Sequence, residues 1–211
     1  MDYKEVYLKS IEHPEEFWLE ESKKIKWFKA PTKAFEQTSE GVYNWFPDGE
    51  TNLSYLCLDQ HIEDGYGDEI ALIYDSAVRQ KQVKYTYSEV LEKVSKLAGG
   101  LKELGVEKGD RVIIYMPMIS HSLFSMLACA RIGAIHSVVF AGFSATALAT
   151  RINDSDCKLV ITRDGSYRGA KTIDLKGIVD EALESCDGVE SVLVAKRINS
   201  DITMKEGRDK W

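Results

Sequence analysis

The sequence predicts an α/β fold: a helical N-terminal arm followed by part of a doubly wound, mainly parallel sheet with helices on both faces. Three short apolar, β-branched runs stand in the middle of the chain, at Arg111–Met116, Ile135–Phe140 and Leu159–Thr162. Two segments with helical spacing separate them, Leu123–Arg131 and Ser144–Ile152. This alternation is typical of βαβ units and a parallel sheet. Such sheets bind ligands in the loops beyond the carboxyl ends of their strands.

The N-terminal part of the chain predicts helices rather than sheet. Residues 1–30 have the spacing of two short helices, and the second begins at Pro14, a position where a first helical turn tolerates proline. From residue 30 to residue 52 the composition turns to Pro, Thr, Gly, Asp and Asn, which indicates mostly irregular chain. We therefore expect an N-terminal extension over residues 1–52 and the first part of a larger domain over residues 53–211.

Local patterns predict three elements before the central units. Residues 53–62 have leucines at helical spacing and predict a short helix. Residues 70–75 and 83–87 are rich in β-formers and predict an antiparallel pair at the margin of the sheet. Thr86 and Glu89 match a capping box, in which each side chain accepts a free backbone N–H, so an amphipathic helix begins there.

After the central units the sequence predicts one more helix and one more strand. Residues 173–185 are amphipathic, and Val192–Ala195 has the character of a fourth parallel strand. The last stretch, residues 199–211, has no apolar period and predicts no regular element.

Composition excludes several classes of function. The chain has 211 residues, 44% of them hydrophobic, and 27 Lys and Arg against 34 Asp and Glu, which gives a formal charge of −7. An acidic chain lacks the positive field that nucleic-acid or anionic-membrane binding needs. No apolar run approaches the roughly 20 residues of a membrane helix, and the charged N-terminus lacks the core of a secretory signal. We expect small-molecule substrates, no nucleic acid, no membrane and a cytoplasmic location.

Metal and catalytic motifs are missing from the sequence. The cysteines are far apart and indicate reduced, buried thiols: Cys57, Cys129, Cys157 and Cys186. No two of the four histidines have metal-ligand spacing, and the phosphate-loop patterns GxxxxGK[ST] and GxGxxG are absent. We therefore predict no metal site and no catalytic residue in this chain.

Two loops remain as candidate ligand sites. The segment after the third central strand places Arg163, Arg168 and Lys171 around two glycines, which suits a phosphate-bearing ligand because glycine lets the backbone approach it. An ordinary solvated basic loop explains the same residues equally well. The segment Phe140–Phe143 after the second strand has small residues that either admit a flat ring near the backbone or let Ser144 cap the next helix.

Several stretches make the sequence resemble a known family. The run MPM…MLACARIGAIHSVVFAGFSATALATRINDSDCKLVIT is similar to the acetyl-CoA and propionyl-CoA synthetases, the AMP-forming acid–CoA ligases of the adenylate-forming superfamily. Residues 52–61 resemble the family's N-x-S-Y-N-C-L-D-R-H segment, and Gly207–Trp211 resembles the start of its G-R-D-x-W-W segment. The helical arm resembles the family's N-terminal extension. The likeness is colinear and covers essentially the whole chain.

The resemblance implies a reaction and a set of contacts. A carboxylate and ATP with Mg²⁺ form an acyl-adenylate and pyrophosphate, a C-terminal lid rotates, and the thiol of coenzyme A (CoA) attacks the adenylate. By this resemblance Arg168 and Lys171 hold the CoA 3′-phosphate, and the loop after the second strand lies against the CoA nucleotide. The implied CoA-binding residues are Arg168, Gly169, Ala170, Lys171, Phe140, Ala141 and Gly142.

The chain departs from the family pattern in two ways. Ala141 replaces a frequent Gly, and Gly169-Ala170 replace a common Arg/Gly-Gly pair, which makes the local backbone path less certain. The family's phosphate loop, acyl pocket, adenylate-binding aspartate and lid would all follow residue 211. We therefore expect a fragment that is inactive alone, exposes apolar surface, and has its ATP and Mg²⁺ residues elsewhere in the parent.

The sequence leaves some alternatives open. It does not choose between acetate and propionate, and it does not predict an oligomeric state. A non-catalytic nucleotide-binding or protein-interaction module on the same sheet is the alternative from another class. A flavodoxin-like mononucleotide binder is weakened because no anion-binding loop follows the first central strand.

Overall fold

The structure is a computed structural model that describes residues 2–169 and 171–211. It divides the chain into two compact units, the first ending at Gln60 and the second running from His61 to Trp211.

The first unit combines two helices with a small hairpin. The predicted helices are α1 (Tyr3–Glu12) and α2 (Pro14–Ser22), with Pro14 in the first turn as expected. The prediction of mostly irregular chain over residues 30–52 missed an antiparallel hairpin, β1 (Phe35–Gln37) and β2 (Tyr43–Trp45). Its short strands are stabilised by aromatic pairs across the hairpin, such as Phe35 with Trp45 at 5.3 Å between ring centroids.

The chain then passes through a helical segment into a second hairpin. The helix predicted over residues 53–62 is a π-helical turn, Tyr55–Asp59, followed by α3 (Gln60–Glu63). The predicted antiparallel pair is β3 (Ile70–Ser76) and β4 (Lys81–Thr86), joined by a short 3₁₀ turn at Ala77–Arg79. This pair forms a sheet of its own rather than the margin of the main sheet, so that part of the prediction was wrong.

Helix α4 (Tyr87–Glu103) begins at the predicted capping box. The Glu89 backbone N–H donates to Thr86 Oγ1 at 3.2 Å, and the Thr86 N–H donates to Glu89 Oε2 at 2.9 Å. Two free backbone donors are satisfied in this way, which explains why the helix starts at this residue. Gly105 follows the helix with a φ of +80°, a conformation that glycine adopts without strain.

The main sheet has five parallel strands in the order β11-β10-β7-β5-β6. They are β5 (Arg111–Met116), β6 (Ile135–Phe140), β7 (Leu159–Arg163), β10 (Ser191–Ala195) and β11 (Asp209–Lys210). The connecting helices are α5 (Ser120–Ile132), α6 (Ala145–Asp154) and α7 (Leu175–Leu183). A small hairpin, β8 (Ser166–Arg168) and β9 (Lys171–Ile173), leads from β7 toward α7.

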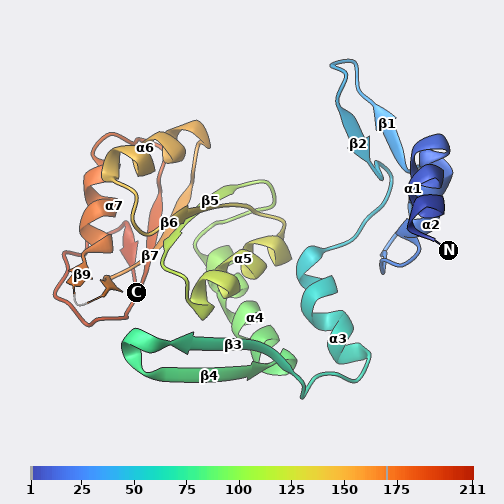
Figure 1. The fold of residues 1–211 in the computed structure, drawn as a ribbon. Coiled ribbons are helices and arrows are strands. Elements are labelled where there is room, and N and C mark those ends of the chain that lie inside the picture. The colour runs from blue at the N-terminus through green and yellow to red at the C-terminus, as the bar shows by residue number, and fades with distance from the viewer. Residues whose placement is uncertain (1, 170) are drawn as a thin grey trace. The chain divides into compact units, whose positions relative to one another are not determined.

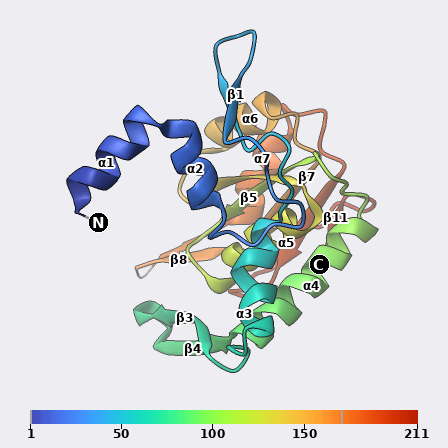
Figure 2. The same cartoon turned by 90° about the vertical axis from the view of Figure 1, so that its right-hand side faces the viewer.

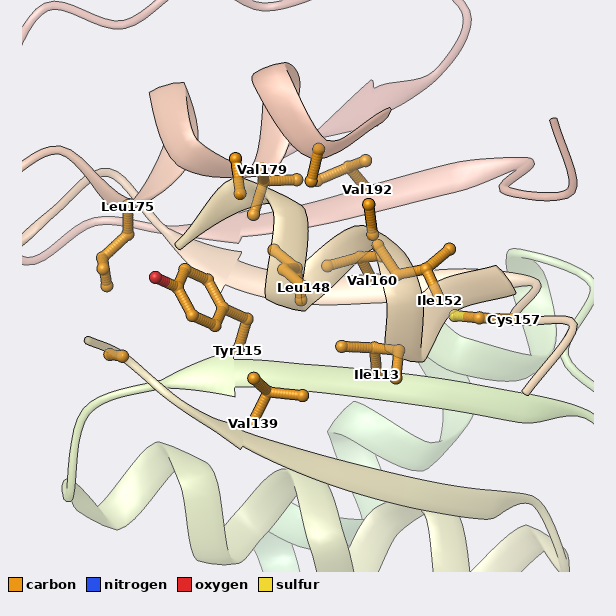
Figure 3. Close-up of a cluster of buried hydrophobic side chains, with 14 of the residues drawn as sticks. Ile113, Tyr115, Val139, Leu148, Ile152, Cys157, Val160, Leu175, Val179 and Val192 are labelled. Carbon is orange, nitrogen blue, oxygen red and sulfur yellow. The ribbon is translucent and has the colours of Figure 1, made fainter. Parts of the chain in front are cut away.

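Helices lie on both faces of this sheet, as predicted (Figure 1). On one face, α6 and α7 pack on the sheet through a buried cluster that includes Ile113, Leu148, Val179 and Val192 (Figure 3). Val112 and Ile114 are also fully buried but point to the opposite face, where α4 and α5 lie, because successive residues of a strand alternate in direction. The predicted α/β class is confirmed.

The C-terminal end is held by a group of charged side chains in addition to the apolar contacts of Ile202 and Met204 with the core. The sequence predicted no element there, but β11 pairs with β10, and Lys176 is only 1% exposed beneath it. The Lys176 ammonium contacts Asp180 at 2.6 Å and Asp209 at 2.8 Å, while Arg208 pairs with both carboxylates. These four side chains, which we call the C-terminal ion network, attach the end of the chain to α7.

Candidate functional site

The carboxyl ends of the parallel strands form one edge of the sheet. β6 lies on one side of β5 and β7 on the other, so the winding of the chain reverses between β5 and β7. In open α/β sheets, ligands bind outside the carboxyl ends of the strands at such a switch point. Both loops singled out in the sequence leave this edge, one after β6 and one after β7. The strand spacing sets their starting points about 10 Å apart, with β5 between them.

The loop after β6 is a tight, anchored turn. The backbone N–H groups of Gly142 and Phe143 both donate to the carbonyl of Phe140, at 2.7 and 3.2 Å. The Tyr115 hydroxyl donates to the Phe143 carbonyl from β5 at 2.9 Å. Ala141 is buried in the core, whereas the side chain of Phe140 is 59% exposed. The turn therefore presents an aromatic ring to solvent from a fixed backbone.

Both interpretations of this loop agree with its geometry. Ser144 Oγ accepts the Ala147 N–H at 3.3 Å, so the helix-capping role is confirmed. A side chain at Gly142 would place its Cβ 3.0 Å from the ring of Phe140, so the glycine leaves room for that ring. Contact between the loop and a flat ligand ring stays a prediction.

The segment after β7 is a hairpin rather than an irregular loop. Arg168 and Lys171 are directly opposite each other in the register of β8 and β9, and both are exposed. Gly169 follows Arg168 with a φ of +60°. Ala170 lies outside the described residues. Figure 2 shows the hairpin projecting from the rest of its unit.

This pair places two positive charges side by side at the hairpin tip. Among the described residues, no carboxylate forms an ion pair with Arg168 or Lys171. Like charges directly opposite in an antiparallel pair are destabilising. An anion between them would relieve that cost, and phosphate oxygens accept well from guanidinium and ammonium donors.

The structure separates Arg163 from this pair. Arg163 ends β7 and is only 4% exposed, and its Nη1 donates to the Lys196 carbonyl at 2.9 Å. It lines a cavity of about 210 Å³ whose other described lining residues are Tyr74, Arg79, Lys81, Lys196 and Arg197. The basic segment thus divides into an exposed pair and a buried arginine.

Sequence reasoning missed the partners of Arg163. Arg79 follows β3 and Arg197 follows β10, so the residues are far apart along the chain. Neither belongs to a recognisable motif, and only the tertiary fold brings them to one cavity. No sequence signal would have found this cluster.

A second cavity of about 430 Å³ lies on the face of the sheet that α4 and α5 cover, and its lining is mainly apolar. It is lined in part by Met116, Phe124, Ile161 and Leu193, from strands β5, β7 and β10 and helix α5. Burial first, and then the positive charge of Arg163, lowers the pKa of His121 at this cavity to about 4. The sheet face beside α4 and α5 therefore leaves apolar surface open above β7 and β10.

Residues 2–169 and 171–211 contain neither a cluster of metal ligands nor a membrane-spanning helix. No group of three or more His, Cys, Asp or Glu side chains comes together there as a metal site. No helix in the same residues has the length and apolar character that a membrane crossing requires.

Comparison with known proteins shows the family to which the chain is similar. The family model described as "AMP-binding enzyme" matches residues 59–210, and the one described as "Acetyl-coenzyme A synthetase N-terminus" matches residues 3–57. The chain is 48% identical over 195 residues to an acetyl-coenzyme A synthetase of Streptomyces avermitilis, which covers 92% of this chain and 30% of that protein. It is 47% identical over 212 residues to acetyl-coenzyme A synthetase 2 of Pseudomonas putida, which covers 100% of this chain and 33% of that protein.

A solved structure has the same fold. Acetoacetyl-CoA synthetase from Streptomyces lividans superposes with a TM-score of 0.86 at 22% identity, over 99% of this chain and 32% of that one. The chain therefore spans about a third of the length of the relatives it matches, and it corresponds to their N-terminal part.

Proposed function

This chain belongs to the AMP-binding enzyme family, and from that premise we propose that it supplies CoA-binding residues to an AMP-forming short-chain acyl-CoA synthetase. The proposed reaction converts acetate or propionate, ATP and CoA to acyl-CoA, AMP and pyrophosphate. Acetate is the better supported acid, because the relatives described above are named acetyl-coenzyme A synthetases. The adenylation chemistry is assigned to the part of the parent that follows residue 211.

One observation carries the assignment of the CoA contacts. Arg168 and Lys171 are an exposed, in-register pair of cations at the ligand-binding edge of the sheet, without a described carboxylate partner. In the proposed site these two side chains hold the 3′-phosphate of CoA. Gly169 has a positive φ and follows Arg168, and Ala170 is included with it on the family resemblance alone.

The loop after β6 takes the nucleotide base in this proposal. Phe140 offers an exposed ring, and Gly142 leaves the room that this ring needs beside the backbone. Ala141 points into the core and holds the turn in place. We therefore assign base stacking to Phe140 and a positioning role to Ala141.

The other substrates have no assigned residues here. ATP is placed on the parent's later segments. The described residues offer no set of metal ligands, so no step of this chain is assigned to Mg²⁺. The proposal includes a cytoplasmic location, which the free state of all four cysteines favours because thiols stay reduced there. Cys129 and Cys157 are buried as predicted, whereas Cys57 is exposed and Cys186 only partly buried, so the prediction of four buried thiols was wrong.

The proposal also includes a division of the chain. Residues 1–52 act as the family's N-terminal extension, and residues 53–211 act as the first part of the large domain. The end of the first compact unit at Gln60 and the meeting of the two family models near residue 58 support a boundary in this region.

The test is kinetic and uses the full-length enzyme. Arg168→Ala should raise the KM for CoA about tenfold, because a hydrogen bond to a charged group contributes roughly 1.5–3 kcal/mol. ATP–pyrophosphate exchange, which reports adenylation alone, should stay at the wild-type rate. Lys84→Ala removes an exposed charge from β4 and is the matched control. An equal fall in exchange and in CoA-dependent turnover would contradict the assignment.

The isolated chain provides a second test. It should show no carboxylate-dependent ATP–pyrophosphate exchange with acetate or propionate, although its circular dichroism spectrum shows a folded protein. Exchange by this chain would place an adenylation site within residues 1–211 and overturn the division of labour proposed here. A reading frame that ends at Trp211 would favour the non-catalytic alternative.

A further inference from the structure

A second group of cations lies apart from the hairpin tip. The cavity of about 210 Å³ at the end of β7 has six described lining residues, five of them Arg or Lys. We call it the cationic pocket. None of its described lining residues is acidic. Such a concentration of one charge in a concave site raises the local concentration of the opposite ion.

The carboxylate that follows Arg163 in the sequence, Asp164, offsets its charge only in part, because burial and Arg197 still lower the pKa of Arg163. Asp164 is fully buried, and its two oxygens accept backbone N–H groups from the chain after β10. The Arg197 and Asn199 N–H groups donate to it at 2.7 Å each, and Ile198 adds a longer contact at 3.2 Å. Asp164 therefore shapes the wall of the pocket, and among the described residues no carboxylate forms a direct ion pair with its guanidinium groups.

Two arginines in the pocket have unused donors. Arg163 is 4% exposed, and its Nε has no hydrogen-bond partner among the described atoms; the Nε of Arg197 is in the same state. Burial first, and then repulsion by Arg197, lowers the pKa of Arg163 to about 10. Burying a charge without a partner costs several kcal/mol. The Lys196 carbonyl and the charge of Asp164 offset part of that cost for Arg163, and an anionic ligand would use the free Nε donors and offset more of it.

The remaining groups are held ready around the cavity. Arg79 Nη1 donates to the Tyr167 hydroxyl at 3.1 Å and to the Arg197 carbonyl at 3.2 Å. The guanidinium carbons of Arg79 and Arg197 lie 5.3 and 5.9 Å from the centroid of the Tyr167 ring. Burial raises the pKa of Tyr74, but hydrogen bonds from Ser76 and Arg197 and the nearby arginine charges outweigh it and lower that pKa. The pocket is thus preorganised and electropositive.

We propose that the cationic pocket binds a small multivalent phosphate anion, of the size of pyrophosphate, at a site separate from the CoA contacts of the hairpin tip. Guanidinium groups suit phosphate oxygens because their donors are arranged as a planar fork. The cavity is smaller than the roughly 300–1,000 Å³ of typical pockets for larger organic ligands. Its position, with Arg163 at the end of β7 beside the switch point, is where this sheet type binds ligands.

The test is a calorimetric titration of the 211-residue chain with inorganic pyrophosphate. Arg79→Gln and Lys81→Gln should each weaken binding, Arg79→Gln by about tenfold. Both side chains are exposed on the β3–β4 hairpin, so these variants should fold even where Arg163→Gln does not. Lys84→Gln makes the same charge change on the opposite face of β4 and should leave the affinity within about twofold.

A second pair of measurements separates this site from the CoA site. Pyrophosphate affinity should be unchanged by Arg168→Gln and by saturating adenosine 3′,5′-bisphosphate, and it should fall as salt rises. Competition by the bisphosphate, or an equal loss in Arg168→Gln, would mean that one site serves both ligands and would overturn the proposal. So would an absence of pyrophosphate binding at millimolar concentration by the folded chain. The KM test of the hairpin tip is independent of these three outcomes, because it measures CoA-dependent turnover of the full-length enzyme.

Discussion

Two regions of this molecule gather positive charge in different ways. In the C-terminal ion network, two cations face two carboxylates, and the Lys176 ammonium donates in addition to the Thr203 carbonyl at 3.1 Å. In the cationic pocket, five cations line one cavity without an acidic lining residue among the described ones. The regions attach to neighbouring strands: β11 belongs to the first, while β7 and the chain after β10 belong to the second.

A buried charge that stabilises the fold has a partner of opposite sign within the chain, whereas a buried charge in a ligand site lacks one. Taking an ion out of water costs several kcal/mol, and a partner ion of opposite sign offsets that cost. The ion network meets this condition within the chain, so its charges stabilise the fold. The cationic pocket does not, and the exposed pair at the hairpin tip also has no described partner. The buried Arg163, whose Nε has no described partner, is therefore the group for which we propose an anion from outside.

The largest loss of stability is expected from a substitution in the C-terminal ion network. Asp209→Asn removes a carboxylate that Arg208 and Lys176 share, and it leaves the almost fully buried Lys176 with Asp180 alone. Removing one member of a buried ion pair costs about 3–5 kcal/mol. We expect the free energy of unfolding in urea to fall by that amount. Asp201→Asn, at an exposed site on the same C-terminal stretch, should change it by less than about 0.5 kcal/mol.

A smaller effect appears on acidification. Burial alone would raise the pKa of Asp209, but hydrogen bonds from Arg208 and Lys176 outweigh it and lower the pKa to about 2, below the ordinary value of 3.8. As the pH falls, the unfolded chain takes up this proton first, so stability present above pH 3.8 is lost as the pH falls toward 2. The loss should be about 2 kcal/mol from this residue.

Unfolding curves between pH 2 and pH 5 measure this contribution. The slope of stability against pH in that interval should be shallower in Asp209→Asn than in the wild-type chain. Identical slopes would show that the carboxylate of Asp209 is not stabilised by its partners, and the contrast between the two regions would lose its basis.

The sequence predicted what depends on local pattern. The capping box of Thr86 and Glu89 acts within three residues, and the strands Arg111–Met116 and Ile135–Phe140 were readable because each is a short β-branched run. Arg168 and Lys171 were also grouped in one segment from the sequence, because only two residues separate them, although the hairpin that pairs them was not predicted. In each case the residues that form the structure are close together in the sequence.

The rest depended on contacts that no local pattern encodes. β11 has two residues, and it forms because the network around Asp209 holds the chain beside β10. The hairpin of the first unit depends on aromatic pairs across its strands. The cationic pocket joins Arg79, Arg163 and Arg197 from three separate segments, so sequence reasoning grouped Arg163 with the wrong cations.

The smallest effect tests the hairpin tip, where stability and binding should move in opposite directions. Lys171→Glu replaces a like-charged neighbour of Arg168 with an opposite charge, and cross-strand pairs of this kind contribute roughly 0.2–1 kcal/mol. The free energy of unfolding should rise by a few tenths of a kcal/mol at low salt, and the gain should shrink at high salt. Lys84→Glu makes the same charge change at an exposed position of β4 that lies opposite Ile73 rather than a cation, and is the control. In the full-length enzyme, Lys171→Glu should also raise the KM for CoA. If Lys171→Glu were less stable and had the wild-type KM for CoA, both predictions would fail. The like-charged pair would then neither destabilise the hairpin nor bind CoA.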